Sequence, residues 1–133
     1  MAIILIVDDE FGIADLLVDV LSDEGHKVVT AANGKRGIEV LETERPELIF
    51  LDYMMPILDG AGMLQKMSEN SGLRTIPVIL MSSMDEETVM ERCKGYSTFL
   101  RKPFRIWQVL ALAAEILGNN KPGPTSPSVD NLP

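Results

Sequence analysis

Short apolar runs alternate regularly with segments of helical periodicity along this chain, and that alternation limits the folds available to it. A continuous run such as Ile3–Val7 is typical of a strand buried on both faces of a sheet. The predicted strands are Ile3–Val7, Lys27–Thr30, Leu48–Leu51, Pro77–Met81 and Thr98–Arg101. The predicted helices are Phe11–Glu24, Lys35–Thr43, Ala61–Glu69, Asp85–Lys94 and Phe104–Leu117.

This order of elements predicts an α/β fold, because strands that alternate with helices form a parallel sheet covered on both faces. Right-handed crossovers restrict the topology further. The best fit is a flavodoxin-like, doubly wound (βα)5 three-layer sandwich with the parallel sheet order 2-1-3-4-5. We expect one folded domain over residues 1–118. The Pro/Gly/Ser-rich stretch 119–133 is expected to be a flexible tail or linker stub.

Composition excludes several classes of function. Twelve basic against 20 acidic residues give a net charge of −8, which is unfavourable for direct binding of nucleic acid. The single cysteine, Cys93, excludes an internal disulfide framework and is expected to be a packing residue. The apolar N-terminal run is too short for a signal peptide or a membrane helix, so a cytoplasmic protein without membrane contact is expected.

Polar and charged residues follow four of the predicted strands. The carboxyl ends of parallel strands meet at one edge of the sheet, where open α/β sheets bind ligands. We therefore expect these side chains to lie together: Asp8 and Asp9 after the first strand, Asp52 after the third, Ser82 and Ser83 after the fourth, and Lys102 after the fifth. Each feature alone is more typical of a loop or a helix cap, and the hypothesis rests on their combination.

The chemistry of this set favours phosphoryl transfer. Close carboxylates repel one another unless a cation lies between them. A few hard oxygen ligands suit Mg²⁺, which keeps several waters and takes one or two carboxylates with phosphate oxygens. A cation, a lysine and a hydroxyl can neutralise the charge of a transferring phosphoryl group. A carboxylate can then act as the nucleophile and form an acyl phosphate.

Four motifs give the chain a resemblance to a known family. They are ILIVDDE at the first strand, LIFLDYMMPILDG around Asp52, VILMSS at the fourth strand and FLRKPF at the fifth. From Ile3 to about Leu117 the sequence resembles the receiver domain of response regulators in two-component signalling. The resemblance implies that Asp52 accepts a phosphoryl group from the phosphohistidine of a histidine kinase or of a phosphotransfer protein.

The resemblance also implies roles for the surrounding residues. Asp9, Asp52 and the backbone carbonyl of Met54 would bind Mg²⁺ directly, and Asp8 would act through a metal-bound water. Lys102 would pair with a phosphoryl oxygen, held by a cis bond to Pro103. Ser82 and Phe99 would be the switch residues, and the fourth helix, fifth strand and fifth helix would form the surface read by a protein effector or by a second copy.

Two local features adjust these expectations. Met54 and Met84 flank the predicted phosphorylation site, and neither can position a water by hydrogen bonding, so slow self-dephosphorylation is expected. The stretch from Ser82 to Gly95 is short by about half a helical turn, so the fourth helix should be short or partly unwound.

Trp107 is expected to anchor the last helix on the sheet.

Other functions remain open at this point. The chain is not expected to be a turnover enzyme, because an aspartate-nucleophile phosphatase needs a second acid at the position of Met54. A flavodoxin-like cofactor binder needs a phosphate-cradling loop where Asp8, Asp9 and Glu10 stand. The chain could also be the receiver part of a larger regulator or hybrid kinase, or a pseudo-receiver that binds without being phosphorylated.

Overall fold

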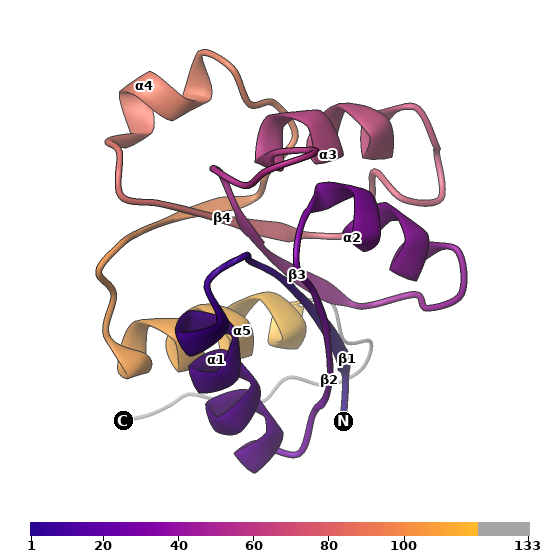
Figure 1. Ribbon diagram of the computed structural model, residues 1–133. Coiled ribbons are helices and arrows are strands. Elements are labelled where there is room, and N and C mark those ends of the chain that lie inside the picture. The colour runs from indigo at the N-terminus through magenta and orange to yellow at the C-terminus, as the bar shows by residue number, and fades with distance from the viewer. Residues whose placement is uncertain (120–133) are drawn as a thin grey trace.

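The structure, a computed structural model, describes residues 1–119; the predicted tail lies outside the described residues from position 120 onwards. Within them, five strands alternate with five helices (Figure 1). The strands are β1 (Ile3–Val7), β2 (Lys27–Ala31), β3 (Leu48–Asp52), β4 (Val78–Ser82) and β5 (Thr98–Arg101). The helices are α1 (Phe11–Asp23), α2 (Gly34–Leu41), α3 (Gly60–Ser68), α4 (Glu86–Met90) and α5 (Ile106–Asn119).

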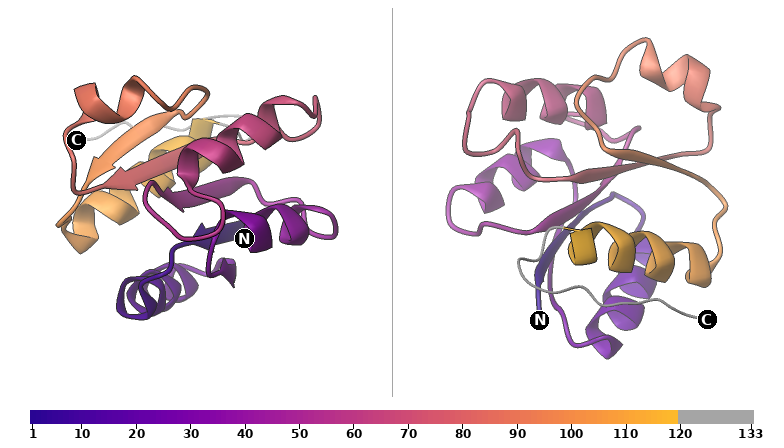
Figure 2. Two further views of the ribbon diagram at one scale, coloured as in Figure 1. Left: turned by 45° about the horizontal axis from the view of Figure 1, so that its top comes forward. Right: turned by 180° about the vertical axis from the view of Figure 1, so that it is seen from behind.

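All four strand pairings are parallel, and the sheet order is β2-β1-β3-β4-β5. Helices α1 and α5 cover one face of the sheet, and α2, α3 and α4 cover the other, as the views in Figures 1 and 2 show. The prediction of a doubly wound three-layer α/β sandwich is confirmed. This order places β1, β3, β4 and β5 side by side, so that their carboxyl ends share one edge.

The central strands are apolar throughout because both of their faces are buried. Successive side chains alternate between the two faces. Leu5 and Val7 pack under α2, α3 and α4, whereas Ile4 and Ile6 pack under α1 and α5. Each such fully buried aliphatic side chain contributes about 1.5–3 kcal/mol of hydrophobic stabilisation. The two cores therefore hold the sheet, and with it the strand ends, in fixed positions.

Helix α4 is a five-residue helix, as the short connection predicted. The Asp85 side chain accepts a hydrogen bond from the Thr88 N–H and caps its start. Val89 and Cys93 anchor the segment in the core, and Gly95 with a φ of 92° turns the chain into β5. The observed helix is thus about half as long as the predicted segment Asp85–Lys94.

The prediction that Trp107 anchors α5 on the sheet is wrong. Its side chain is 67% exposed, and the buried residues of α5 are Val109, Ala113 and Leu117. These recur at intervals of four and form one stripe of the helix, whereas Trp107 lies two residues before Val109, on the opposite side. An exposed tryptophan therefore lies on the outer surface of α5.

Gly60 brings the start of α3 against the end of β3. A Cβ atom at this position would lie 2.7 Å from the backbone oxygen of Asp52, so only glycine fits there without displacing the backbone. The Gly60 N–H donates to the Tyr53 carbonyl at 2.9 Å, and the Asp59 side chain caps α3. The loop that follows Asp52 is thereby tied back to the strand.

Candidate active site at the carboxyl edge of the sheet

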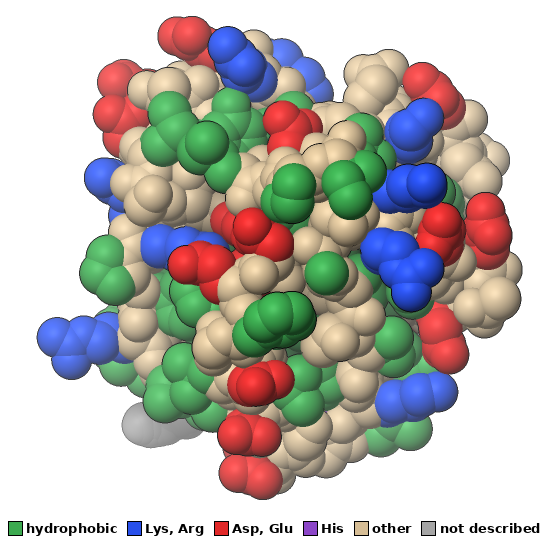
Figure 3. Space-filling view, in the orientation of Figure 1, with side chains coloured by type: hydrophobic (Ala, Val, Ile, Leu, Met, Phe, Trp, Pro, Cys, Tyr) green, Lys and Arg blue, Asp and Glu red, His purple; other side chains and the backbone are tan. Residues whose placement is uncertain are grey.

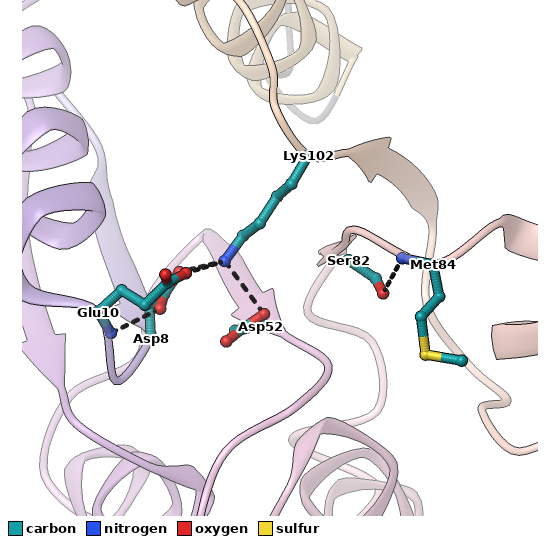
Figure 4. Close-up of polar contacts among 6 residues, drawn as sticks. All are labelled: Asp8, Glu10, Asp52, Ser82, Met84 and Lys102. Atoms are coloured by element: carbon teal, nitrogen blue, oxygen red, sulfur yellow. Dashed lines mark hydrogen bonds and ion pairs between the residues drawn. The ribbon is translucent and has the colours of Figure 1, made fainter.

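Four of the predicted site residues meet at the carboxyl edge of the sheet (Figure 4). Asp52 and Ser82 are the last residues of β3 and β4, and Asp8 and Lys102 follow directly after β1 and β5. Asp8 stays fixed beyond its strand because its N–H donates to the Ala31 carbonyl at 3.1 Å. The Lys102 N–H donates to the Ser82 carbonyl at 2.8 Å, which continues the pairing of β5 with β4.

Lys102 lies at the centre of the charged cluster. Its ammonium nitrogen is 2.9 Å from Glu10 Oε1, 3.1 Å from Asp8 Oδ2 and 3.2 Å from Asp52 Oδ1. The Asp8 side chain is fully buried and that of Asp52 is 7% exposed, whereas that of Glu10 is 59% exposed. One lysine thus faces three carboxylates, two of which are removed from water.

Burial and crowding shift the pKa values of this cluster. Burial, reinforced by the neighbouring Asp8, raises the pKa of Asp52 to about 7 against the pull of Lys102. Burial also raises the pKa of Asp8, opposed by the hydrogen bond from the Glu10 N–H and by Lys102. Burial lowers the pKa of Lys102, but contacts with Glu10, Asp52 and Asp8 outweigh it and the net shift is upward. The single positive charge of Lys102 is therefore not enough to balance the negative charges of Asp8, Glu10 and Asp52.

The donor set fits a hard divalent cation. Carboxylate oxygens of Asp8, Glu10 and Asp52 lie within 4.8 Å of one another, and oxygen ligands of this kind suit Mg²⁺. Asp9 is exposed, but it lines the same hollow as Asp52, Met54, Ser82 and Lys102. Figure 3 shows acidic side chains gathered near the middle of this face. A cation there would counter both the burial and the repulsion by Asp8 that raise the pKa of Asp52.

Glu10 is a site residue that the sequence analysis missed. Its carboxylate approaches Lys102 from the loop after β1, where the run Asp8-Asp9-Glu10 places three consecutive acids. The resemblance assigns roles to the two aspartates and none to the third acid. The sequence feature that could have identified Glu10 is its position in the short loop after β1, directly beside Asp8 and Asp9 and close to the carboxyl edge of the sheet.

The predicted switch residues occupy different positions. The Ser82 hydroxyl accepts a hydrogen bond from the Met84 N–H at 3.0 Å (Figure 4), and it lines the hollow. Phe99 is half-buried on β5 and packs against the core under α4. It does not line the hollow; instead it borders a separate apolar groove with Trp107 and Leu112.

The two methionines near Asp52 and Ser82 differ in exposure. Met54 is 64% exposed at the rim of the hollow, and Met84 is partly buried. The Lys102–Pro103 peptide bond is cis, as the resemblance implied.

Cys93 is buried, and burial raises the pKa of its thiol to about 11, which leaves it an inert packing residue. Among residues 1–119, no helix is long and apolar enough to cross a membrane.

Comparison with known proteins identifies the same architecture. Residues 4–114 match the family described as response regulator receiver domain. The chain is 37% identical over 108 residues to the sporulation initiation phosphotransferase F of Bacillus subtilis, a match that covers 80% of this chain and 86% of that protein.

Two solved structures resemble it closely in backbone. One is the signal receiver domain of a signal transduction histidine kinase from Syntrophus aciditrophicus, with a TM-score of 0.85, 28% identity and coverage of 96% and 98% of the two chains. The other is the receiver domain of a sensor histidine kinase from Pseudomonas aeruginosa, solved with a magnesium ion in its active-site cleft. Its TM-score is 0.82 at 24% identity, with coverage of 88% and 98%.

The family match spans residues 4–114, and the relative in Bacillus matches 80% of the chain. The backbone similarity to the receiver from Syntrophus aciditrophicus agrees with the sheet order found here. The chain belongs to the response regulator receiver domains of two-component signalling.

Proposed function

We propose that Asp52 is the phosphoacceptor of a signalling switch and that it takes its phosphoryl group from a phosphohistidine of a histidine kinase or phosphotransfer protein. The observation that carries this proposal is the placement of Asp52. Asp52 is the last residue of β3 and lines the hollow. Its Oδ1 lies 3.2 Å from the ammonium nitrogen of Lys102. A protein of this kind is a signalling component and not a turnover enzyme.

In the proposed step, an Asp52 carboxylate oxygen forms a bond to phosphorus as the phosphorus–nitrogen bond of the phosphohistidine breaks. The leaving imidazole nitrogen keeps the electron pair and then takes a proton. The product is an acyl phosphate on Asp52. Lys102, held at the same edge, can donate a hydrogen bond to a phosphoryl oxygen and stabilise its charge.

Mg²⁺ is the proposed cofactor. Asp9, Asp52 and the Met54 carbonyl would hold it directly and Asp8 through a water, as in the resemblance described above; the magnesium-bound receiver from Pseudomonas aeruginosa supports a metal in this place. Bound there, Mg²⁺ would neutralise phosphoryl oxygens during transfer.

Phosphorylation would be read at the face formed by α4, β5 and α5. It adds about −1.5 to −2 charges at a buried edge. The Ser82 hydroxyl would leave the Met84 N–H for the phosphoryl group, and Phe99 would repack. The groove that Phe99 and Trp107 border lies on this face and offers apolar surface to a protein effector. A phosphorylation-dependent homodimer through it is a second candidate output, and a cytoplasmic location fits the proposed partners.

Two alternatives stay within the same family. The chain could act as the receiver part of a larger regulator or hybrid kinase, which the similarity to the receiver of a histidine kinase supports. A pseudo-receiver that is never phosphorylated is disfavoured by the presence of both Asp52 and Lys102 in contact.

Incubation with acetyl phosphate, followed by intact mass over time, tests the proposal. We expect a single phosphoryl adduct on the wild type in the presence of Mg²⁺ and none with EDTA. Asp52→Asn should take up no adduct under either condition. A full adduct on Asp52→Asn would exclude Asp52 as the acceptor, and an equal adduct in EDTA would exclude the metal requirement.

We predict that the phosphorylated protein loses its phosphoryl group slowly, over many minutes or longer. Met54 lies at the rim of the hollow, and its thioether cannot orient an attacking water. Met54→Asn, which adds a donor and an acceptor at this rim, should accelerate the loss several-fold in the same mass measurement. Met90→Asn changes an exposed methionine outside the hollow and serves as the control. A wild-type half-life of a few seconds would contradict the prediction.

A further inference from the structure

Glu10 contacts the reacting site, yet the scheme above gives its side chain no task. Its carboxylate makes the shortest of the three contacts to the Lys102 ammonium, at 2.9 Å, against 3.1 Å for Asp8 and 3.2 Å for Asp52. It is also the most exposed of the three acids. A close but exposed partner differs from the buried pair in how easily it can leave.

The hydrogen-bonding capacity of Lys102 makes this difference matter. An ammonium group has three N–H donors, and three carboxylates surround this one. Asp52 gives up its contact when it carries the phosphoryl group, but Lys102 can turn a further N–H toward the phosphoryl oxygens only if Asp8 or Glu10 gives up its hydrogen bond. The existing contacts therefore compete directly with the phosphoryl group.

The three acceptors are not equally free to move. Asp8 is fully buried, and its carboxylate accepts a hydrogen bond from the Glu10 N–H at 2.9 Å. Loss of its contact with Lys102 would leave a buried negative charge that water cannot reach. Asp52 carries the incoming group. The Glu10 side chain can turn into solvent, where water replaces the lost contact at little cost.

We propose that Glu10 is a positioning residue that holds the Lys102 ammonium before phosphorylation and releases it to the phosphoryl oxygens afterwards. This inference rests on the proposed function of Asp52. Glu10 thus restrains the unphosphorylated state through Lys102 and takes no part in the phosphorylated one.

The test uses Glu10→Gln, which keeps the size of the side chain and removes its charge. With acetyl phosphate and saturating Mg²⁺, the initial rate of adduct formation should rise about two- to five-fold, the range that the coupling of a partly exposed ion pair allows. The rate of phosphoryl loss should not change, because Glu10 has already released Lys102. Glu115→Gln removes the same charge from an exposed position of α5 and should leave both rates unchanged.

Repeating the measurement in a Lys102→Met variant distinguishes an effect of Glu10 that acts through Lys102 from simple repulsion between Glu10 and the negatively charged acetyl phosphate. In Lys102→Met, the further change Glu10→Gln should have no effect on the rate, since the contact is already gone. The Mg²⁺ affinity of Glu10→Gln, measured by titration calorimetry, should change by no more than about three-fold, the effect of one half-exposed charge.

Three results would overturn the inference while leaving the proposed function intact. They are an unchanged or slower rate in Glu10→Gln, the same acceleration in the Lys102→Met background, and a loss of Mg²⁺ affinity of about ten-fold or more, as expected for a direct metal ligand. A wild type that forms no adduct would instead overturn the proposed function, and this inference with it.

Discussion

Replacement of Asp52 by asparagine is expected to make the metal-free protein more resistant to unfolding at pH 8. Burial and the neighbouring Asp8 raise the pKa of Asp52 to about 7 in the folded protein. In the unfolded chain the pKa of an aspartate is near 4. The folded state therefore binds the proton more tightly, and stability is lost as the pH rises from about 4 to about 7. Asparagine imitates the neutral carboxyl and removes this loss.

We expect a gain of about 1–3 kcal/mol in the free energy of unfolding at pH 8, less than the full linkage value because the charged site relaxes and admits water. The gain should become small near pH 4 and vanish at lower pH, where the wild-type carboxyl is protonated in both the folded and the unfolded state. Urea titrations followed by circular dichroism in EDTA measure both values. Asp19→Asn, at an exposed position of α1, should change stability little at either pH.

A destabilised Asp52→Asn at pH 8 would contradict this account of the site. So would a gain of the same size at pH 4 and pH 8, because that gain would have a cause other than the ionisation of the carboxyl.

Lys102→Met is expected to have the opposite effect on stability and a large effect on phosphorylation. Lys102 is the cation that contacts Asp8, Glu10 and Asp52, and methionine retains the apolar stem without the charge. Removing it at pH 8 leaves two buried carboxylates without a positively charged partner, which should cost about 1–3 kcal/mol after some protonation of the acids. The initial rate of adduct formation should fall at least about ten-fold, as when a preorganised donor to a developing charge is removed.

The same urea titrations and mass measurements read both effects. Lys66→Met removes an exposed lysine of α3 and should match the wild type in both assays. Adding Asp52→Asn to Lys102→Met should restore part of the lost stability, because one of the two unpaired buried charges is then absent. If Lys102→Met is as stable as the wild type at pH 8 and is phosphorylated at the wild-type rate, Lys102 has neither role.

The fold was largely predictable because its signals are local and strong. The continuous apolar run Ile3–Val7 and the run around Phe50 have the length and character of doubly buried strands, and both strands begin where they were expected. The short α4 was also foreseeable from the length of its segment. Trp107 was misplaced because side-chain size suggested burial, whereas the stripe of Val109, Ala113 and Leu117 decides which face of α5 meets the sheet.

The site was predictable to the level of the strand ends and no further. Sequence order and parallel topology bring Asp8, Asp52, Ser82 and Lys102 to one edge, since each follows or ends a strand. The contact between Glu10 and Lys102 joins residues 92 positions apart through two side chains, and it depends on rotamers that no spacing reveals. For the same reason, the hydrogen bond from the Met84 N–H to the Ser82 hydroxyl emerged only from the structure.

Locating the phosphoryl group chemically tests the central claim most directly. Borohydride reduces an acyl phosphate to an alcohol, which would convert a phosphorylated Asp52 into homoserine and release phosphate. Peptide sequencing by tandem mass spectrometry, after treatment with acetyl phosphate and Mg²⁺, should then find homoserine at position 52 alone. Homoserine at position 8 or 9, or the corresponding reduced side chain at position 10, with an unmodified Asp52, would contradict the assignment of Asp52 as the phosphoacceptor.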